Sequence, residues 1–340
     1  MNRSLNMKVK GLILFVALSL AAVAAAETWR LTEGRTWQPV GQTGDGGSVM
    51  AVSKAKQLVS TGKTGQAKKA FAKLKADYPE FAGKDFDAFV EAELLLSKRK
   101  WEKAAFAYDK LTNNFPQSPL FDSAMERQYQ IATAFLNGQK KPVLGVFRVK
   151  AYDEGSEIMN KIADKAGDAP IAKNALTTLA VSREKRGAYN EAYLAWAVVA
   201  DKWPTGDVGK DALLGMARSL ELDYKGPKFD SKVVESSRSY YAEYQKRYPD
   251  TAAELSVSDK IVQLDEKLAE KELAIADYYA RTNSDTAAGL YYQRTIDDWP
   301  NSTMAKQAEK KLDTLKQEMA KKAHAQLSGK KKFNWKGLFL

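Results

Sequence analysis

The chain has 340 residues, a formal net charge of +11 and an ordinary apolar content of 44%. It contains no cysteine and a single histidine, which excludes thiol catalysis, disulfides, Cys/His zinc clusters and histidine-based triads in the folded body. Ten prolines, many alanines and the lack of long Val/Ile/Thr alternation favour helices over strands.

The first 26 residues have the pattern of a cleavable signal peptide. Basic residues precede an apolar run at residues 11–22, and the alanines at 24–26 supply the small side chains needed for cleavage before Glu27. The alternative is an uncleaved membrane anchor, for which the apolar run is short. Val23 stands where the lipid-bearing cysteine of a lipoprotein would be, so no lipid anchor forms there. We therefore expect an exported, non-lipidated protein of the periplasm.

The positive charge is concentrated at the C-terminus. Cleavage would remove three basic residues and lower the net charge from +11 to +8, and residues 306–336 alone carry ten lysines against three acids. The rest of the chain is close to neutral, so the charge does not indicate a nucleic-acid groove, and we expect no nucleic-acid partner.

Residues 27–47 contain two tryptophans and a glycine-rich run without periodicity, which predicts an extended arm and linker. We expect Trp29 and Trp37 to dock onto the protein's own first repeat. Docking onto a partner is the alternative.

A helix–turn–helix pattern follows, and its clearest copy spans Ala88–Pro119. A turn at residues 98–100 separates two short helices, and Trp101 begins the second. The second helix carries a small residue, two larger apolar residues and a closing aromatic-proline pair, at Ala104, Tyr108, Leu111 and Phe115-Pro116. Proline stops the helix because it lacks an N–H group. This combination is typical of a tetratricopeptide (TPR) unit of roughly 34 residues.

The second-helix pattern recurs along the chain. Four further copies close on aromatic-proline pairs, at Ala67/Phe71/Leu74/Tyr78-Pro79, Ala192/Trp196/Val199/Trp203-Pro204, Ser237/Tyr241/Tyr244/Tyr248-Pro249 and Ala288/Tyr292/Thr295/Trp299-Pro300. A sixth, less regular copy contains Gly155, Met159 and Ile162. The sequence therefore predicts an all-α fold, a TPR superhelix (α-α solenoid) of five to six helix–turn–helix units over residues 48–323.

Four segments depart from the regular repeat. Insertions are expected at 138–150 and 224–230, and a long helical run at 252–280. A final amphipathic helix at 303–323 suits a solvated cap, followed by a basic-aromatic tail at 324–340.

Residue patterns that suggest chemistry have simpler explanations. Gly62-Lys63-Thr64 resembles the end of a phosphate-binding loop but lacks the earlier glycine and a preceding strand. Asp297 and Asp298 are adjacent in a helix and do not face each other, and His324 lies in a lysine-rich segment. We expect no catalytic, cofactor or metal site.

TPR arrays recognise extended peptides or partner helices along the concave face, which is formed by the first helices. By repeat register this groove contains aromatic, polar and acidic side chains, namely Phe86, Phe89, Glu93, Tyr129, Thr133, Asn174, Thr177 and Glu184. An ordinary solvated helix face is the alternative.

The C-terminal tail interleaves positive charge with large apolar side chains, at Lys330, Lys331, Lys332, Phe333 and Trp335. This pattern favours attachment to an anionic membrane surface or to a partner. A disordered tail, or one that folds back on the last repeat, is the alternative.

With the repeats placed, residues 48–316 resemble the BamD family of TPR lipoproteins, part of the outer-membrane β-barrel assembly machinery. The resemblance is carried by the aromatic-proline repeats, the insertion GQKKPVLGVFRVKAYDEG at Gly138–Gly155, and the segment LAEKELAIADYYARTNSDTAAGLYYQRTIDDWPNS at Leu268–Ser302. It implies a non-enzymatic periplasmic scaffold at the outer membrane that binds other assembly subunits or unfolded barrel precursors.

Two other functions stay open. One is a different envelope scaffold, for example a Tol-Pal coordinator of peptidoglycan synthesis with outer-membrane constriction. The other is an enzyme with a carboxylate site that the residue spacing does not reveal.

Overall fold

The computed structural model describes residues 29–31, 37–39, 46–143 and 147–331, and the predicted signal peptide and the end of the tail lie outside these ranges. The described residues are predominantly helical, which confirms the predicted all-α fold of TPR type. The α-helices are α1 (Gly46–Ser60), α2 (Thr64–Asp77), α3 (Lys84–Ser97), α4 (Trp101–Asn114), α5 (Phe121–Leu136), α6 (Tyr152–Ala166), α7 (Pro170–Lys185), α8 (Tyr189–Lys202), α9 (Gly206–Asp223), α10 (Lys232–Arg247), α11 (Pro249–Glu254), α12 (Val257–Arg281), α13 (Asp285–Asp298) and α14 (Thr303–Lys331). A 3₁₀ turn, η1, covers Pro79–Phe81.

The chain divides into two compact units. Unit 1 contains the residues up to Phe135 together with Gln139–Ile158 and Asp164–Ile171, and unit 2 contains Leu136–Gly138, Met159–Ala163 and the residues from Ala172 onward. Each unit has its own core. In unit 1 the helices α1 to α5 bury a cluster that includes Phe71 and Tyr108. In unit 2 one cluster surrounds Tyr244 and another surrounds Tyr292.

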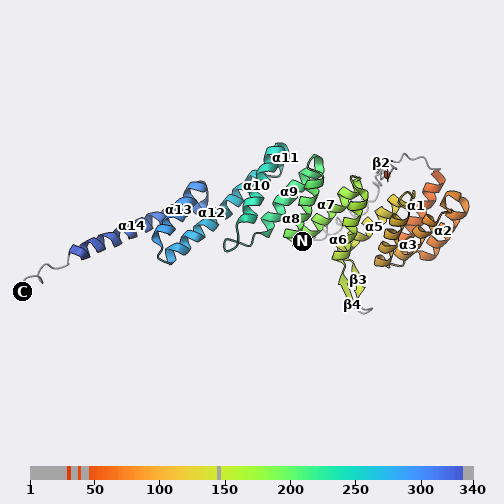
Figure 1. Cartoon of the computed structure of the whole chain (residues 1–340), viewed down its shortest axis with the longest axis horizontal. Helices are drawn as coiled ribbons and strands as arrows, with labels where there is room; N and C mark the ends of the chain where they lie inside the picture. The colour runs from red at the N-terminus through yellow and green to blue at the C-terminus, as the bar shows by residue number, and fades with distance from the viewer. Residues whose placement is uncertain (1–28, 32–36, 40–45, 144–146, 332–340) are drawn as a thin grey trace, which may run out of the picture. The chain divides into compact units, whose positions relative to one another are not determined.

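Helices follow one another as antiparallel pairs, as α3 and α4 do in unit 1 and α12 and α13 do in unit 2 (Figure 1). In the described residues the pairs are α1–α2, α3–α4, α5–α6, α7–α8, α9–α10 and α12–α13. Each predicted second-helix pattern therefore lies on the second helix of a pair. The helix α14 follows as the expected additional helix.

Four turns inside these pairs share one geometry. The residue two places before the second helix has a positive φ in each of them, at Gly62 (73°), Arg99 (55°), Gly187 (76°) and Asn283 (58°). In the α3–α4 turn the N–H of Arg99 bonds the carbonyl of Leu96 at 2.8 Å, and that of Lys100 bonds Leu95 at 3.0 Å. These two bonds satisfy carbonyls at the end of the first helix, as in a Schellman motif. The turn predicted at residues 98–100 is confirmed.

The aromatic-proline pairs end the second helices. The aromatic residue leaves the helical conformation in every case, with φ between −129° and −135° and ψ between 58° and 99° at Tyr78, Phe115, Trp203, Tyr248 and Trp299. Its own N–H still bonds a helical carbonyl, as Phe115 does to Leu111 at 2.8 Å. The following proline excludes the helical conformation at the aromatic residue, so the helix stops there.

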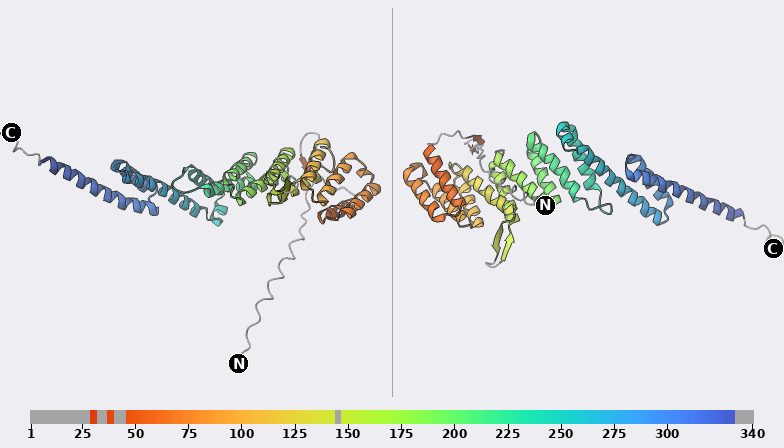
Figure 2. Two further views of the ribbon diagram at one scale, coloured as in Figure 1. Left: turned by 90° about the horizontal axis from the view of Figure 1, so that it is seen from below. Right: turned by 180° about the vertical axis from the view of Figure 1, so that it is seen from behind.

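The structure adds detail to one of the expected departures and corrects another. The insertion at 138–150 forms an antiparallel hairpin of β3 (Lys140–Val143) and β4 (Phe147–Lys150), which extends away from the helices of its unit (Figure 2, right). The run at 252–280 is not one helix, because Ser256 takes a left-handed conformation (φ 52°) and separates α11 from α12. No glycine or proline marks this break in the sequence.

Both ends of the repeat array contain structure that the sequence did not predict. The helix α14 continues to Lys331, beyond the end expected at residue 323. In the N-terminal arm, β1 (Trp29–Leu31) and β2 (Trp37–Pro39) pair as antiparallel strands. Only the strand pairing of Trp29 and Trp37 is described, so the docking of their side chains stays a prediction.

Candidate functional site

Two of the predicted groove residues belong to the core. Phe86 is 2% exposed and Phe89 is 1% exposed. Their rings pack edge-to-face on Phe71 of α2, with centroids 6.2 and 6.5 Å apart. The prediction that they contact a peptide is wrong for this structure, because their spacing places both on the buried face of α3.

Glu93 is also enclosed. Its carboxylate accepts hydrogen bonds from Arg127 of α5 at 2.6 Å (Nε) and 3.0 Å (Nη2), and from the Tyr108 hydroxyl of α4 at 2.7 Å. The Glu93 and Arg127 side chains are 0% and 5% exposed. Burial lowers the pKa of Arg127, but the charge of Glu93 and the hydrogen bond to it raise that pKa above the ordinary value. Burial and then the Glu93 charge raise the pKa of Tyr108 well above its ordinary value. Glu93 therefore ties three helices together instead of facing a groove.

Glu184 of α7 occupies a second cluster of the same kind in unit 2. The carboxylate accepts bonds from Arg218 of α9 at 2.8 Å, from Trp196 Nε1 of α8 at 2.7 Å and from the Ser219 hydroxyl at 2.9 Å. The side chain of Glu184 is 11% exposed. The described hydrogen bonds of Glu184 are made within the protein, and its contact with a partner stays a prediction.

Two more clusters complete the series. In each, a carboxylate on a first helix accepts a bond from a tyrosine on the second helix and pairs with a lysine one helix pair further on. They are Glu221–Tyr241–Lys260 and Asp277–Tyr292–Lys311. The carboxylate and the cation are separated by 34 residues in three of the four clusters and by 39 in the other. Opposite charges one repeat apart were therefore a sequence signal that the prediction missed.

The other predicted groove residues lie at the surface or half-buried. Asn174 is exposed, and Tyr129 is half-buried. The Thr177 hydroxyl donates to the carbonyl of Lys173 on its own helix at 2.8 Å. The hydroxyl oxygen of Thr133 is buried and has no hydrogen-bond partner in the described part of the chain. Their contact with a partner stays a prediction.

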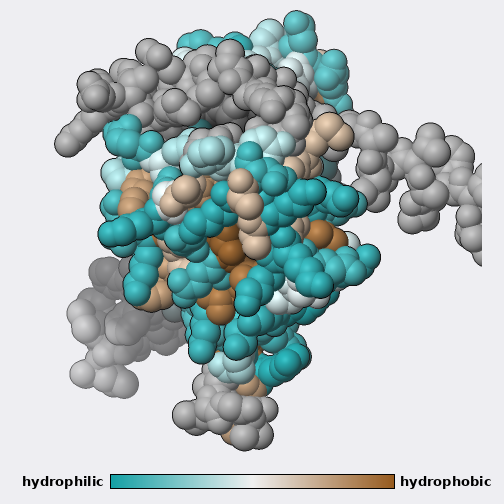
Figure 3. Space-filling model, turned by 90° about the vertical axis from the view of Figure 1, so that its right-hand side faces the viewer, coloured by the Kyte–Doolittle hydropathy of each residue, from teal (hydrophilic) through white to brown (hydrophobic). Residues whose placement is uncertain are grey.

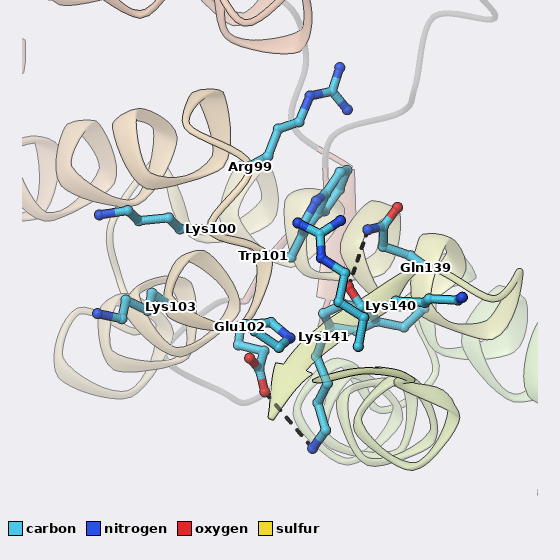
Figure 4. Close-up of a pocket in the computed structure, with 11 residues that line it drawn as sticks. Arg99, Lys100, Trp101, Glu102, Lys103, Gln139, Lys140 and Lys141 are labelled. Atoms are coloured by element: carbon cyan, nitrogen blue, oxygen red, sulfur yellow. Dashed lines mark hydrogen bonds and ion pairs between the residues drawn. The ribbon is translucent and has the colours of Figure 1, made fainter. Parts of the chain in front are cut away.

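A basic cavity of about 380 Å³ lies in unit 1, where the base of the β3–β4 hairpin meets the turn between α3 and α4. Six cations and one carboxylate line it, namely Arg99, Lys100, Lys103, Lys140, Lys141, Arg148 and Glu102. Trp101 lies among them, and Lys141 points toward Glu102, 3.9 Å away (Figure 4). Lys141 also pairs with Glu154, and the hydrogen bond between them raises the pKa of Lys141. The other five cations form no ion pair with a described residue, so the cavity is strongly positive.

A polar cavity of about 600 Å³ lies in unit 2 between α10, α12 and α13. Three ion pairs of the described residues line it, Arg238 with Asp265, Arg294 with Glu272 and Arg294 with Asp298. Arg294 Nε is 3.1 Å from Glu272 Oε1 but outside hydrogen-bonding geometry, and this oxygen has no hydrogen-bond partner among the described residues. Burial raises the pKa of Glu272.

Exposed apolar side chains recur at one position of the repeat, two residues before the buried aromatic of the second helix. Phe106 is 61% exposed, Leu194 52% and Leu290 67%. The face of unit 1 shown in Figure 3 is mostly hydrophilic, with hydrophobic residues in small separate groups. Three second helices therefore share an exposed apolar position, in addition to single exposed apolar residues elsewhere, such as Phe229 and Val262.

The predicted tail lies mostly outside the described residues. Lys330 and Lys331 are at the end of α14, whereas Lys332, Phe333 and Trp335 are not described. None of the described helices is long and apolar enough to cross a membrane. Within the described ranges, no group of three His, Cys, Asp or Glu side chains is arranged to hold a metal ion.

The fold defines the class of the protein as an all-α helical-repeat protein of TPR type. No protein-family model matches the chain, and no curated protein sequence does.

Chains similar to this one are found among solved structures. PilW, a widely conserved type IV pilus biogenesis factor, is 15% identical, with 78% of this chain and 99% of that chain covered and a TM-score of 0.29. The C-terminal part of a TPR repeat-containing protein from Cytophaga hutchinsonii is 12% identical, with 75% and 98% covered and a TM-score of 0.22. At these TM-scores the likeness supports no further conclusion.

Proposed function

We propose that this protein is a non-enzymatic, exported scaffold that binds protein partners through its helical repeats. The observation that carries the proposal is the exposed apolar side chain at the same repeat position on α4, α8 and α13. The equivalent residues on α2 and α10 are Lys69 and Ser239, so the repeat itself does not require an apolar residue there. Exposed apolar side chains at a recurring position favour contact with another protein.

The resemblance to the BamD family narrows the proposal to a component that acts in outer-membrane β-barrel assembly, with assembly subunits or unfolded barrel precursors as partners. Its most family-like segment, Leu268–Ser302, contains the end of α12 and all of α13, including Leu290. We place the protein in the periplasm, peripheral to the outer membrane.

Affinity purification from crosslinked envelope fractions tests this function. The triple variant F106S/L194S/L290S should fold as the wild type does, because all three side chains are exposed, and should lose the partners that the wild type retains. The matched control is K69S, which changes the same repeat position on α2. If the triple variant retains every partner, the proposal that these three positions contact partners is wrong.

The identity of the partners separates the two envelope functions. Barrel-assembly subunits would support the BamD-like function, and peptidoglycan synthases would instead support a Tol-Pal coordinator.

The tail requires a separate test. Removal of residues 324–340 should release the protein from the membrane fraction if the lysines and aromatics of the tail hold it there. A truncated protein that stays with the membrane would contradict this attachment.

A further inference from the structure

The β3–β4 hairpin has one blocked edge and one open edge. Ala151 N bonds Gln139 O at 3.2 Å, and the strand register pairs Lys141 with Val149. Bonded and non-bonded pairs alternate along an antiparallel ladder, so the backbone groups of Arg148 and Lys150 point away from β3. By the same alternation, the backbone groups of Lys140 and Pro142 on β3 point away from β4.

The outer edge of β3 cannot readily pair with another strand. Pro142 occupies an outward-facing position and has no N–H group to donate to a further strand. The missing N–H does not weaken the β3–β4 pairing, because it would point away from β4. The carbonyl of Lys140 accepts a hydrogen bond from the side chain of Gln139 at 3.3 Å. One donor is therefore missing and one acceptor is occupied.

The outer edge of β4 has neither a proline nor a described side chain bonded to its outward carbonyls. All four of its residues are exposed, and the N–H groups of Arg148 and Lys150 bond no described residue. Natural sheets usually protect such an edge, because its free N–H and C=O groups accept a further strand. An unprotected edge on a hairpin that extends from its unit is suited to strand addition.

The side chains of β4 specify what kind of strand would fit. The strand alternation places Arg148 and Lys150 on one face and Phe147 and Val149 on the other. Phe147 is 65% exposed and Val149 is 43% exposed. A segment added beside β4 would therefore meet cations on one face and apolar groups on the other.

The surrounding charge strengthens the preference for acidic residues. Beside Arg148, the cavity at the hairpin base holds four cations that form no ion pair with a described residue. The carboxylates of Glu102 and Glu154 are both directed to Lys141. The local field thus favours an acidic segment and disfavours a basic one.

We propose that the open edge of β4 binds an extended segment of a partner protein as a third strand, in which acidic and apolar residues alternate. This inference rests on the proposed scaffold function and names the kind of segment that one surface of the scaffold takes. An anionic membrane is a poorer partner, because the backbone groups of Arg148 and Lys150 would stay unpaired in the apolar layer.

Fluorescence anisotropy with labelled peptides tests the pairing. The purified protein should bind (Val-Glu)₄ at least about tenfold more tightly than (Val-Lys)₄, because the lysines of the second peptide face Arg148 and Lys150. A (Val-Glu)₄ peptide with N-methyl groups on the pairing edge should lose the binding, because methylation removes its backbone donors. Equal binding of methylated and unmethylated peptides would overturn strand addition without any change to the protein.

Two substitutions at one position separate charge from backbone pairing. R148Q removes the charge and should weaken (Val-Glu)₄ binding about threefold. R148P removes the outward N–H as well, at a position directly across from Pro142, and should weaken binding about tenfold in total. The control K73Q removes an exposed charge of α2 and should leave the affinity unchanged. Circular dichroism of R148P checks that the helices are intact.

Envelope purification distinguishes the failure of this inference from the failure of the proposed function. Partners that bind the wild type and R148Q but not R148P support strand addition. Partners retained by R148P overturn it and leave the scaffold function standing, whereas the absence of any partner for the wild type overturns the scaffold function. Binding to phosphatidylglycerol vesicles without peptide binding, equally reduced in R148Q and R148P, would replace the strand with a membrane contact.

Discussion

The Glu93 cluster of unit 1 and the Asp277 cluster of unit 2 have the same plan but different surroundings. Each joins a carboxylate, a tyrosine hydroxyl and a cation 34 residues further on. The ion pair of Glu93 and Arg127 is 0% and 5% exposed, whereas that of Asp277 and Lys311 is 31% and 41% exposed.

From this difference in exposure we expect the same geometry to contribute different free energies in the two clusters. A buried ion pair is costly to break, because the charge that remains has neither water nor a partner. An exposed pair is screened by water, and removal of one partner leaves the other solvated. The variants E93Q and D277N test this comparison directly, and variants elsewhere in unit 2 test helix packing and the burial of a carboxyl group.

The largest effect is expected for E93Q. The substitution leaves Arg127 buried without its counter-charge and should lower the free energy of unfolding of unit 1 by about 3–5 kcal/mol. Urea unfolding followed by circular dichroism measures the loss. The triple variant E93L/Y108F/R127M removes both charges and the tyrosine hydroxyl that bonds Glu93, and should recover most of the stability. A loss below about 1 kcal/mol for E93Q would show that burial does not govern the strength of the cluster.

Two glycines inside helices test packing around the clusters. A Cβ atom added at Gly215 of α9 would lie 2.4 Å from the ring of Trp196, whose indole donates to Glu184. G215A should therefore destabilise unit 2 by about 1–3 kcal/mol.

The matched control is Gly289 of α13, the second helix of the Asp277 cluster. A Cβ atom there would lie 3.8 Å from Leu312 and Leu315, which is ordinary contact. G289A should be neutral or stabilising by up to about 1 kcal/mol, because alanine is the better helix former. Thermal unfolding of both variants checks the pair, and equal destabilisation would contradict the packing difference.

The buried carboxyl of Glu272 predicts a pH dependence. Because burial raises its pKa above the ordinary 4.5, the folded protein binds more protons than the unfolded chain at pH values between the two pKa values. The free energy of unfolding should therefore fall as the pH rises through this range. E272Q should remove that dependence and be more stable than the wild type at neutral pH, with the advantage lost below pH 4.5. Urea unfolding at a series of pH values measures it, and parallel curves for the two proteins would refute the effect.

The smallest effect is expected for D277N. Asp277 and Lys311 are both partly exposed, so the lost pair should cost no more than about 1 kcal/mol. Urea unfolding at low and high salt checks this value, and the small difference from the wild type should shrink further as salt is added. A loss as large as that of E93Q would remove the distinction between the two clusters.

Much of the fold was predictable, because the helix ends and turns of the repeat depend on residues that are close in the sequence. The aromatic-proline pairs predicted where the second helices end, since proline acts on the residue just before it. The tight turn before Trp101 was also predictable, although its left-handed residue is Arg99 and not a glycine.

The groove was less predictable, because the register assigns a helix face but not its neighbours. Phe86, Phe89 and Glu93 are on the expected helix, yet α2, α4 and α5 cover them. The break between α11 and α12 at Ser256 was also not predictable, because no glycine or proline marks it in the sequence.

The sequence by itself determined the all-α repeat, its helix ends and its turns, because each depends on residues within one or two helical turns. Only the tertiary structure decided which carboxylates are buried and which edge of the hairpin is open. Burial depends on helices one repeat away, and an edge is open only when nothing in the folded chain pairs with it.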